Sequence, residues 1–136
     1  MSFDLASLDT TTACDKGTEI ELKHPVTNVP LGMFIKIIGK DSKEFKDFTR
    51  QKINERLRKD ALSQKRGKDP EIRTIEGIEE ENIELLTLCT KGWRGVELNG
   101  KELPFTPENV KKVYKEYSWI YEAINTSIGE LDNFLK

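Results

Sequence analysis

Polar and apolar side chains alternate along residues 19–24, with a period of two that is typical of a half-buried strand. A second apolar run covers residues 31–38 and is rich in the aromatic and branched side chains that suit a pleated sheet. Between the two runs, residues 25–30 contain two prolines and an asparagine, which favour a turn. The pattern therefore predicts a β-hairpin over residues 17–39.

The spacing of apolar residues changes after this hairpin and becomes helical. Asp41 or Ser42 can accept a hydrogen bond from a free amide of the first turn, so we expect a helix to begin there and to run to about residue 64. A second helix is predicted over residues 78–90, with glutamates in its first turns, where they suit the helix dipole. The predicted apolar stripe of the first helix consists of Phe45, Phe48, Ile53, Leu57 and Ala61.

The last third of the chain predicts a short hairpin and two further helices. Residues 91–95 end the preceding helix, and the Asn-Gly pair within residues 96–103 fits a two-residue hairpin turn. Thr106 followed by Pro107 is typical of a helix start, and the last helix begins at Ser118. The expected apolar rows of the two helices are Val110, Val113, Tyr114 and Tyr117, then Ile120, Ala123, Ile124, Ile128, Leu131 and Leu135.

These elements predict an α+β fold in which an N-terminal β-hairpin precedes a mainly α-helical part of about four helices, with a short second hairpin. Residues 1–16 show no clear period and are expected to form a flexible N-terminal arm. Residues 17–136 are expected to form one domain, with the hairpin at 17–39 and the mainly helical part at 42–136.

Composition narrows the class of protein. The chain has 136 residues, of which 36% are apolar and 34% charged, so it is too apolar to be disordered throughout. Its formal net charge of −2 does not favour binding of nucleic acid over the whole surface. No signal peptide and no apolar run long enough to span a membrane are expected. Cys14 and Cys89 could form a disulfide, but two thiols do not resemble a secreted disulfide framework, so a reducing cytoplasm is the simpler interpretation.

The residues do not indicate catalytic chemistry. His24 is the only histidine, so a histidine-based metal cluster cannot be built within one chain, and its place beside a proline favours a turn residue. A Cys–His pair would need Cys14 or Cys89 next to it. The glycines follow neither the Walker nor the Rossmann pattern. We therefore expect no enzyme activity, no cofactor and no metal.

One cluster of charge needs its own interpretation. Residues 50–68 carry eight basic side chains against Glu55 and Asp60, and such a face can contact phosphates. The following helix is acidic, so the two helices could instead pair, or each could face water. No aromatic side chains interleave with the basic ones, so we do not expect nucleic acid as a partner.

Several segments, taken in order, resemble the tail assembly chaperones of long-tailed bacteriophages. The resemblance is densest over residues 88–93 (LCTKGW) and 96–110 (VELNGKELPFTPENV), where that family has a helix ending at tryptophan, then a short hairpin and a capped helix with a tyrosine, here Tyr114. Residues 22–27, 31–32 and 39–42 at the front, and Trp119-Ile120 and residues 133–135 at the end, are also similar to family segments. Thr106 departs from the family, where serine is more frequent, and the basic stretch matches nothing in it.

The resemblance implies a non-enzymatic assembly factor in the host cell cytoplasm that is absent from the mature virion. Its partner would be the tape measure protein, a long helical polypeptide that aggregates before tail tube subunits polymerise around it. The family is often made in two lengths by ribosomal frameshifting, and the longer form recruits the tail tube protein. The main alternative is a virion structural protein of the tail completion or head–tail joining type, followed by a small enzyme or a nucleic-acid-binding regulator.

The expected partner surface lies on the last two helices. An amphipathic helix of the client would dock between them, and aromatic anchors dominate many interfaces. Self-association, with strand edges of the first hairpin available for pairing, is a further expectation because a long client needs several chaperones. Trp93, Tyr114 and Phe134 are expected in the core. The candidate contact residues are Trp119, with partial exposure, and Val110, Val113, Tyr117, Ile120 and Ile124.

Overall fold

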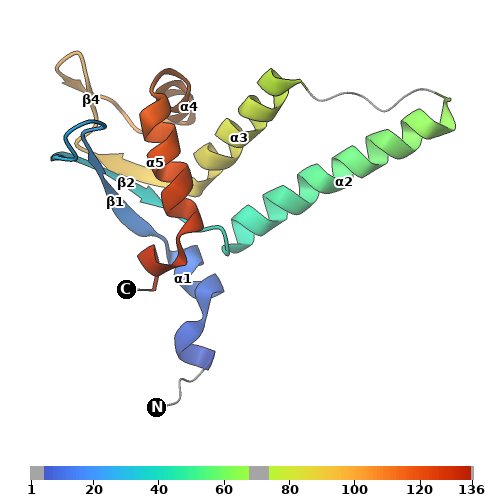
Figure 1. Cartoon of the computed structure of the whole chain (residues 1–136), viewed down its shortest axis with the longest axis horizontal. Helices are drawn as coiled ribbons and strands as arrows, with labels where there is room; N and C mark the ends of the chain where they lie inside the picture. The colour runs from blue at the N-terminus through green and yellow to red at the C-terminus, as the bar shows by residue number, and fades with distance from the viewer. Residues whose placement is uncertain (1–4, 68–73, 136) are drawn as a thin grey trace.

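The computed structural model describes residues 5–67 and 74–135, and it has the predicted α+β fold (Figure 1). Lys68, the last residue of the basic stretch, and the N-terminal residues 1–4 lie outside the described residues. The element bounds are η1 (Leu5–Leu8), α1 (Thr10–Lys16), β1 (Thr18–Lys23), β2 (Pro30–Ile37), α2 (Lys43–Lys65), α3 (Ile75–Cys89), β3 (Thr90–Arg94), β4 (Glu97–Leu98), β5 (Lys101–Glu102), α4 (Pro107–Glu116), α5 (Ser118–Gly129) and η2 (Leu131–Asn133).

The main sheet has three antiparallel strands in the order β1-β2-β3. The predicted hairpin supplies β1 and β2 and is confirmed. Strand β3 was not predicted, because residues 91–95 were expected only to end a helix. Its sequence is too short and too polar to show alternation, and its extended form depends on pairing with β2, where Trp93 lies opposite Ile35.

The two faces of this sheet differ as the alternation predicts. Leu22, Ile35 and Ile37 point inward and are buried beneath the helices. On the other face, the Arg94 guanidinium lies 3.9 Å from the centre of the Phe34 ring and donates to both carboxylate oxygens of Glu19, at 2.8 and 3.1 Å. Since Glu19, Phe34 and Arg94 belong to β1, β2 and β3 respectively, this contact links all three strands on the outer face.

Helices α3, α4 and α5 cover the inner face and complete one core. Thr106 caps α4 as predicted, since its hydroxyl accepts from the Asn109 amide at 3.1 Å. Ser42 caps α2 in the same way, through the Phe45 amide at 3.3 Å. Of the aromatics expected in the core, Tyr114 and Phe134 are buried and Trp93 is half-buried.

The N-terminal segment differs from the predicted loose arm. Residues 10–16 form α1, whose N-cap Asp9 accepts from the Thr12 amide at 3.1 Å, and Cys14 in this helix is fully buried. Asp15 also accepts from the Lys43 amide at 2.8 Å, which links α1 to the start of α2. The helix was missed because its seven residues are too few to show a period, and its order comes from these contacts with distant residues.

Helix α2 departs most from expectation. Its 23 residues span about 35 Å, and none of them is buried. The predicted stripe does not form one face, because the five-residue step from Phe48 to Ile53 rotates the side chain by about 140° around the helix axis. Phe45 and Phe48 are half-buried near the start, whereas Ile53 and Leu57 are 48% and 62% exposed. Beyond its start, α2 diverges from α3 and leaves the body of the protein (Figure 1).

Candidate partner-binding surface

The six predicted contact residues fall into two groups. Trp119 and Tyr117 are half-buried. This agrees with the partial exposure that was predicted for Trp119. The other four are buried in the core, so they cannot contact a partner with most of their side chain: Val110, Val113, Ile120 and Ile124. These four residues belong to the core cluster, together with buried residues of the sheet and α3, so a groove role for them stays a prediction.

Four of the six nevertheless border one small apolar pocket. Val113, Tyr117, Trp119 and Ile120 line a cavity of about 130 Å³ where α4 meets α5. Val110 and Ile124 lie elsewhere in the core. The opposite wall comes from residues that sequence reasoning did not assign to a site: Met33 of β2, and Val96, Leu98 and Leu103 in or beside the β4–β5 hairpin. The alternation of apolar residues in 96–103 was the available signal for this wall.

The junction between α4 and α5 sets the position of the aromatic pair. Tyr117 is the last residue before α5, with φ −117° and ψ 80°, outside helical values. Its amide donates to the Val113 carbonyl at 2.9 Å, and its carbonyl accepts from the Ile120 amide at 3.0 Å. One residue thus ends α4 and begins α5. Trp119 therefore lies in the first turn of α5, next to Tyr117 at the pocket.

Trp93 fixes the β4–β5 hairpin against this pocket. Its indole Nε1 donates to the Leu103 carbonyl at 2.9 Å, and the Leu103 amide donates to the Val96 carbonyl at 2.8 Å. The Trp93 ring also meets Phe105 edge to face, with centroids 5.4 Å apart. Asn99 and Gly100 both have positive φ, which confirms the predicted two-residue turn. Trp93 of β3 therefore fixes the position of the β4–β5 hairpin, which forms one wall of the pocket.

The charges around the pocket are few and of both signs. Glu97 lies on the hairpin side, and Lys112 and Glu116 lie on α4. An apolar floor with a mixed rim suits an apolar side chain of a partner more than an ion. The cavity is similar in size to engineered apolar cavities of about 150 Å³ that bind benzene, so one ring or branched side chain fits.

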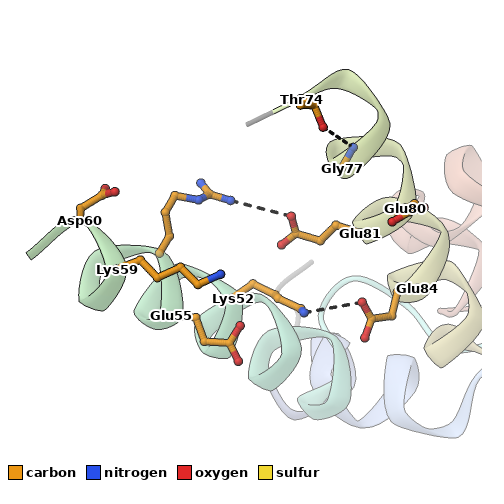
Figure 2. Close-up of a pocket in the computed structure, with 10 residues that line it drawn as sticks. Lys52, Glu55, Lys59, Asp60, Thr74, Gly77, Glu80, Glu81 and Glu84 are labelled. Carbon is orange, nitrogen blue, oxygen red and sulfur yellow. Dashed lines mark hydrogen bonds and ion pairs between the residues drawn. The ribbon is translucent and has the colours of Figure 1, made fainter. Parts of the chain in front are cut away.

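A second hollow, of about 390 Å³, lies between α2 and α3 and is lined mainly by charge. Lys52 lies 3.6 Å from Glu84, and Arg56 lies 4.0 Å from Glu81, so basic side chains of α2 face acidic ones of α3 (Figure 2). The alternative that the basic and acidic helices pair is thus confirmed near the point where they meet. These pairs are partly solvent-exposed, so each contributes at most about 1 kcal/mol.

The candidate reactive groups differ in exposure, since His24 is exposed and both cysteines are buried. His24 is exposed at the β1–β2 turn, where its Nδ1 accepts from the amides of Val26 and Thr27 at 3.1 and 3.2 Å. Both cysteines are buried free thiols, and burial raises the pKa of Cys14 and raises that of Cys89 to about 12. A buried, protonated thiol is a poor nucleophile. Among the residues that the structure describes, no cluster of histidine, cysteine or acidic side chains could hold a metal ion.

Comparisons of the chain with protein-family models, curated proteins and solved structures find no match. Within the described ranges, the chain has no helix that is both long and apolar enough to cross a membrane.

Proposed function

We propose that this protein is a phage tail assembly chaperone, which binds the tape measure protein, keeps it soluble and helps the tail tube to assemble around it. The resemblance of residues 88–110 to that family suggests the role. The structural observation that supports it is the apolar pocket beside Trp119 and Tyr117, two half-buried aromatics at a helix junction.

The pocket suggests how a client segment would be held. One apolar anchor from an amphipathic helix of the tape measure protein would enter the cavity, while the exposed parts of Trp119 and Tyr117 would cover the neighbouring turn of that helix. This contact is small, so each site would bind weakly, and tube subunits could displace the chaperone. Reversible binding is what an assembly factor needs if it is to leave before the virion is complete.

The proposal is non-catalytic and places the protein in the host cell cytoplasm during assembly, absent from the mature virion. A longer frameshifted form would recruit the tail tube protein. Mass spectrometry of purified particles distinguishes this proposal from a tail completion or head–tail joining protein, because such a protein would be found in the virion.

Co-expression with the tape measure gene of the same genome tests the function. The client should be soluble with the wild-type chain and insoluble without it, and the chaperone proposal is wrong if the wild-type chain leaves it insoluble. Trp119→Ala should lose this effect while circular dichroism shows a folded protein. Phe34→Ala is the matched control, because Phe34 is also half-buried but lies on the outer face of the sheet.

A second variant tests the pocket without removing an aromatic side chain. Leu98→Glu places a carboxylate at the hairpin wall of the cavity, where Leu98 is half-buried and outside the main core cluster. It should also leave the client insoluble. If both variants keep the client soluble, the pocket is not the client site.

A further inference from the structure

Helix α2 has a basic face that points away from α3 of the same chain. Lys52 and Arg56 face α3, so side chains about half a turn around the helix from them face the opposite way. From residue 50 onward, no acidic residue lies on this opposite side, and Asp47 lies on it only before that point. We call its six exposed members the outer face of α2: Arg50, Asn54, Leu57, Arg58, Ala61 and Lys65.

The outer face has charge and apolar surface that nothing in the described chain covers. None of the 23 residues of α2 is buried, and the helix projects from the body of the protein (Figure 1). Among the described residues, no ion pair includes Arg50, Arg58 or Lys65. Leu57, between these cations, is 62% exposed. Most helical stability in proteins comes from packing, so this face fits a surface that is acidic and partly apolar.

An acidic groove of about 520 Å³ lies between the first turns of α3 and the junction of α4 with α5. Glu76, Glu79 and Ile83 line it from one face of α3, since they are spaced by three and four residues. Tyr121 of α5 lies across from them. The lining contains three glutamates and one lysine, Lys115, which gives a net charge of −2. We call it the α3–α5 groove.

The α3–α5 groove places a carboxylate beside an aromatic ring. Ile83 and Tyr121 are half-buried and pack against the core, so they form its apolar part. The pKa of Tyr121 is raised, mainly by burial and also by the Glu79 carboxylate, which therefore lies near this hydroxyl. Within the described part of the chain, Glu76 and Glu79 take part in no ion pair. The groove thus fits a cation that lies next to an apolar side chain.

We propose that the outer face of α2 of one copy binds in the α3–α5 groove of a second copy. Leu57 lies against the apolar part of the groove, and Arg58 beside it meets the glutamates of α3. The contact cannot form within one chain, because the outer face points away from its own α3. The two surfaces differ, so the contact is head-to-tail, and it continues to larger assemblies unless a ring closes.

Charge complementarity selects a second copy as the occupant. The groove has a net charge of −2, and α2, with eight basic and four acidic residues, has a net charge of +4. Both surfaces are present on every copy in equal number, so each helix finds a groove. This inference is independent of the proposed chaperone function, since no residue lines both this groove and the apolar pocket at the α4–α5 junction.

The first test is the molar mass of the nuclease-treated full chain, measured by light scattering over about a hundredfold range of concentration. The mass should rise with concentration past that of a dimer, and high salt should reduce it. Glu79→Lys should weaken association about fivefold or more, and Glu76→Lys is a second groove variant with the same expected effect. Glu102→Lys is the matched control, because it makes the same change of charge at an exposed glutamate of β5 and should have no effect.

A mixture of two variants tests whether the contact is head-to-tail. Leu57→Gln damages the helix surface and leaves the groove intact, and alone it should associate about tenfold more weakly than the wild type. Glu79→Lys damages the groove and leaves the helix intact. Mixed together, the intact helix of the second variant binds the intact groove of the first. The remaining helix and groove are both damaged, so native mass spectrometry should show a 1:1 heterodimer that does not extend.

A chain that stays monomeric at every concentration overturns the proposal. So does an equal effect of Glu102→Lys and Glu79→Lys, because net charge alone would then control association. A mixture that associates no more than each variant by itself excludes the head-to-tail contact. Association that nuclease treatment abolishes would assign the basic face of α2 to nucleic acid instead.

Discussion

Thr90 and Tyr114 share a buried hydrogen bond whose direction can be assigned. The Thr90 hydroxyl donates its only hydrogen to the Leu86 carbonyl at 2.7 Å, so at the 2.6 Å contact with Tyr114 it must accept, and the Tyr114 hydroxyl donates. Tyr114 belongs to α4, and Thr90 lies where α3 passes into β3. The bond therefore joins the helical layer to the third strand.

Because Tyr114 donates and Thr90 accepts, substitutions at these two residues should cost different amounts of unfolding free energy. Tyr114→Phe should cost about 1 kcal/mol of unfolding free energy, because Thr90 keeps Leu86 as its acceptor. Thr90→Val should cost about 2–3 kcal/mol, because it leaves the Tyr114 hydroxyl buried without an acceptor. Thr87→Val is the control, since Thr87 makes the same bond to the Ile83 carbonyl, at 2.7 Å, in a half-buried position. Urea unfolding measures all three, and a larger cost for Tyr114→Phe than for Thr90→Val would contradict the assigned direction.

Burial of Cys89 predicts a loss of stability in alkali. Burial raises the pKa of this thiol from 9.0 to about 12, so the folded state holds the proton more tightly than the unfolded state. The resulting stability is complete below pH 9 and is lost as pH rises toward 12, at most about 1.4 kcal/mol per pH unit. Burial also raises the pKa of Tyr114 from its ordinary value of 10.0. The stability that comes from the protonated Tyr114 hydroxyl therefore begins to fall at a higher pH than the contribution of Cys89. Urea unfolding between about pH 8 and 10 should show a decline that Cys89→Ala reduces; an equal decline in both would contradict the prediction.

Gly95 and Gly100 offer a matched pair of glycines with positive φ, +73° and +80°. A Cβ atom at Gly95 would lie 2.3 Å from the Gly32 carbonyl oxygen, whereas one at Gly100 would meet nothing within 4 Å. Gly100→Ala should cost about 1–2 kcal/mol from the backbone conformation alone. Gly95→Ala should cost clearly more, because the β2 and β3 backbones must also separate. Thermal unfolding of the two variants measures the difference. Equal costs would contradict the prediction, since the β2 and β3 backbones would then separate at little cost.

The elements that were predicted correctly are those whose cause is local. The Asn99-Gly100 turn, the Thr106 cap and the alternation in β1 act within a few residues, so they are visible in the sequence. Strand β3 and helix α1 were missed because their order depends on partners far along the chain, such as Ile35 for Trp93. The predicted stripe on α2 is not a single face, because the five-residue step from Phe48 to Ile53 rotates the side chain by about 140° around the helix axis.

The same distinction between local and long-range causes explains which parts of the candidate site could be predicted. The partial exposure of Trp119 follows from its place in the first turn of a helix, which the sequence shows. The burial of Val110 and Ile124 and the wall from Met33 and Leu98 depend on how the sheet, the second hairpin and two helices pack together. A row of apolar residues does not reveal which of its members a distant element covers.

The salt dependence of client binding should show which surface holds the client. The pocket at the α4–α5 junction is apolar with a rim of both signs, so a titration with a tape measure segment should give a micromolar affinity, about 8 kcal/mol, that high salt weakens little. Contact through the basic face of α2 would instead weaken steeply with salt. Arg58→Glu, on the exposed surface of α2, should leave the affinity unchanged. A large loss of affinity at high salt, together with a loss in Arg58→Glu, would move the client site from the pocket to α2.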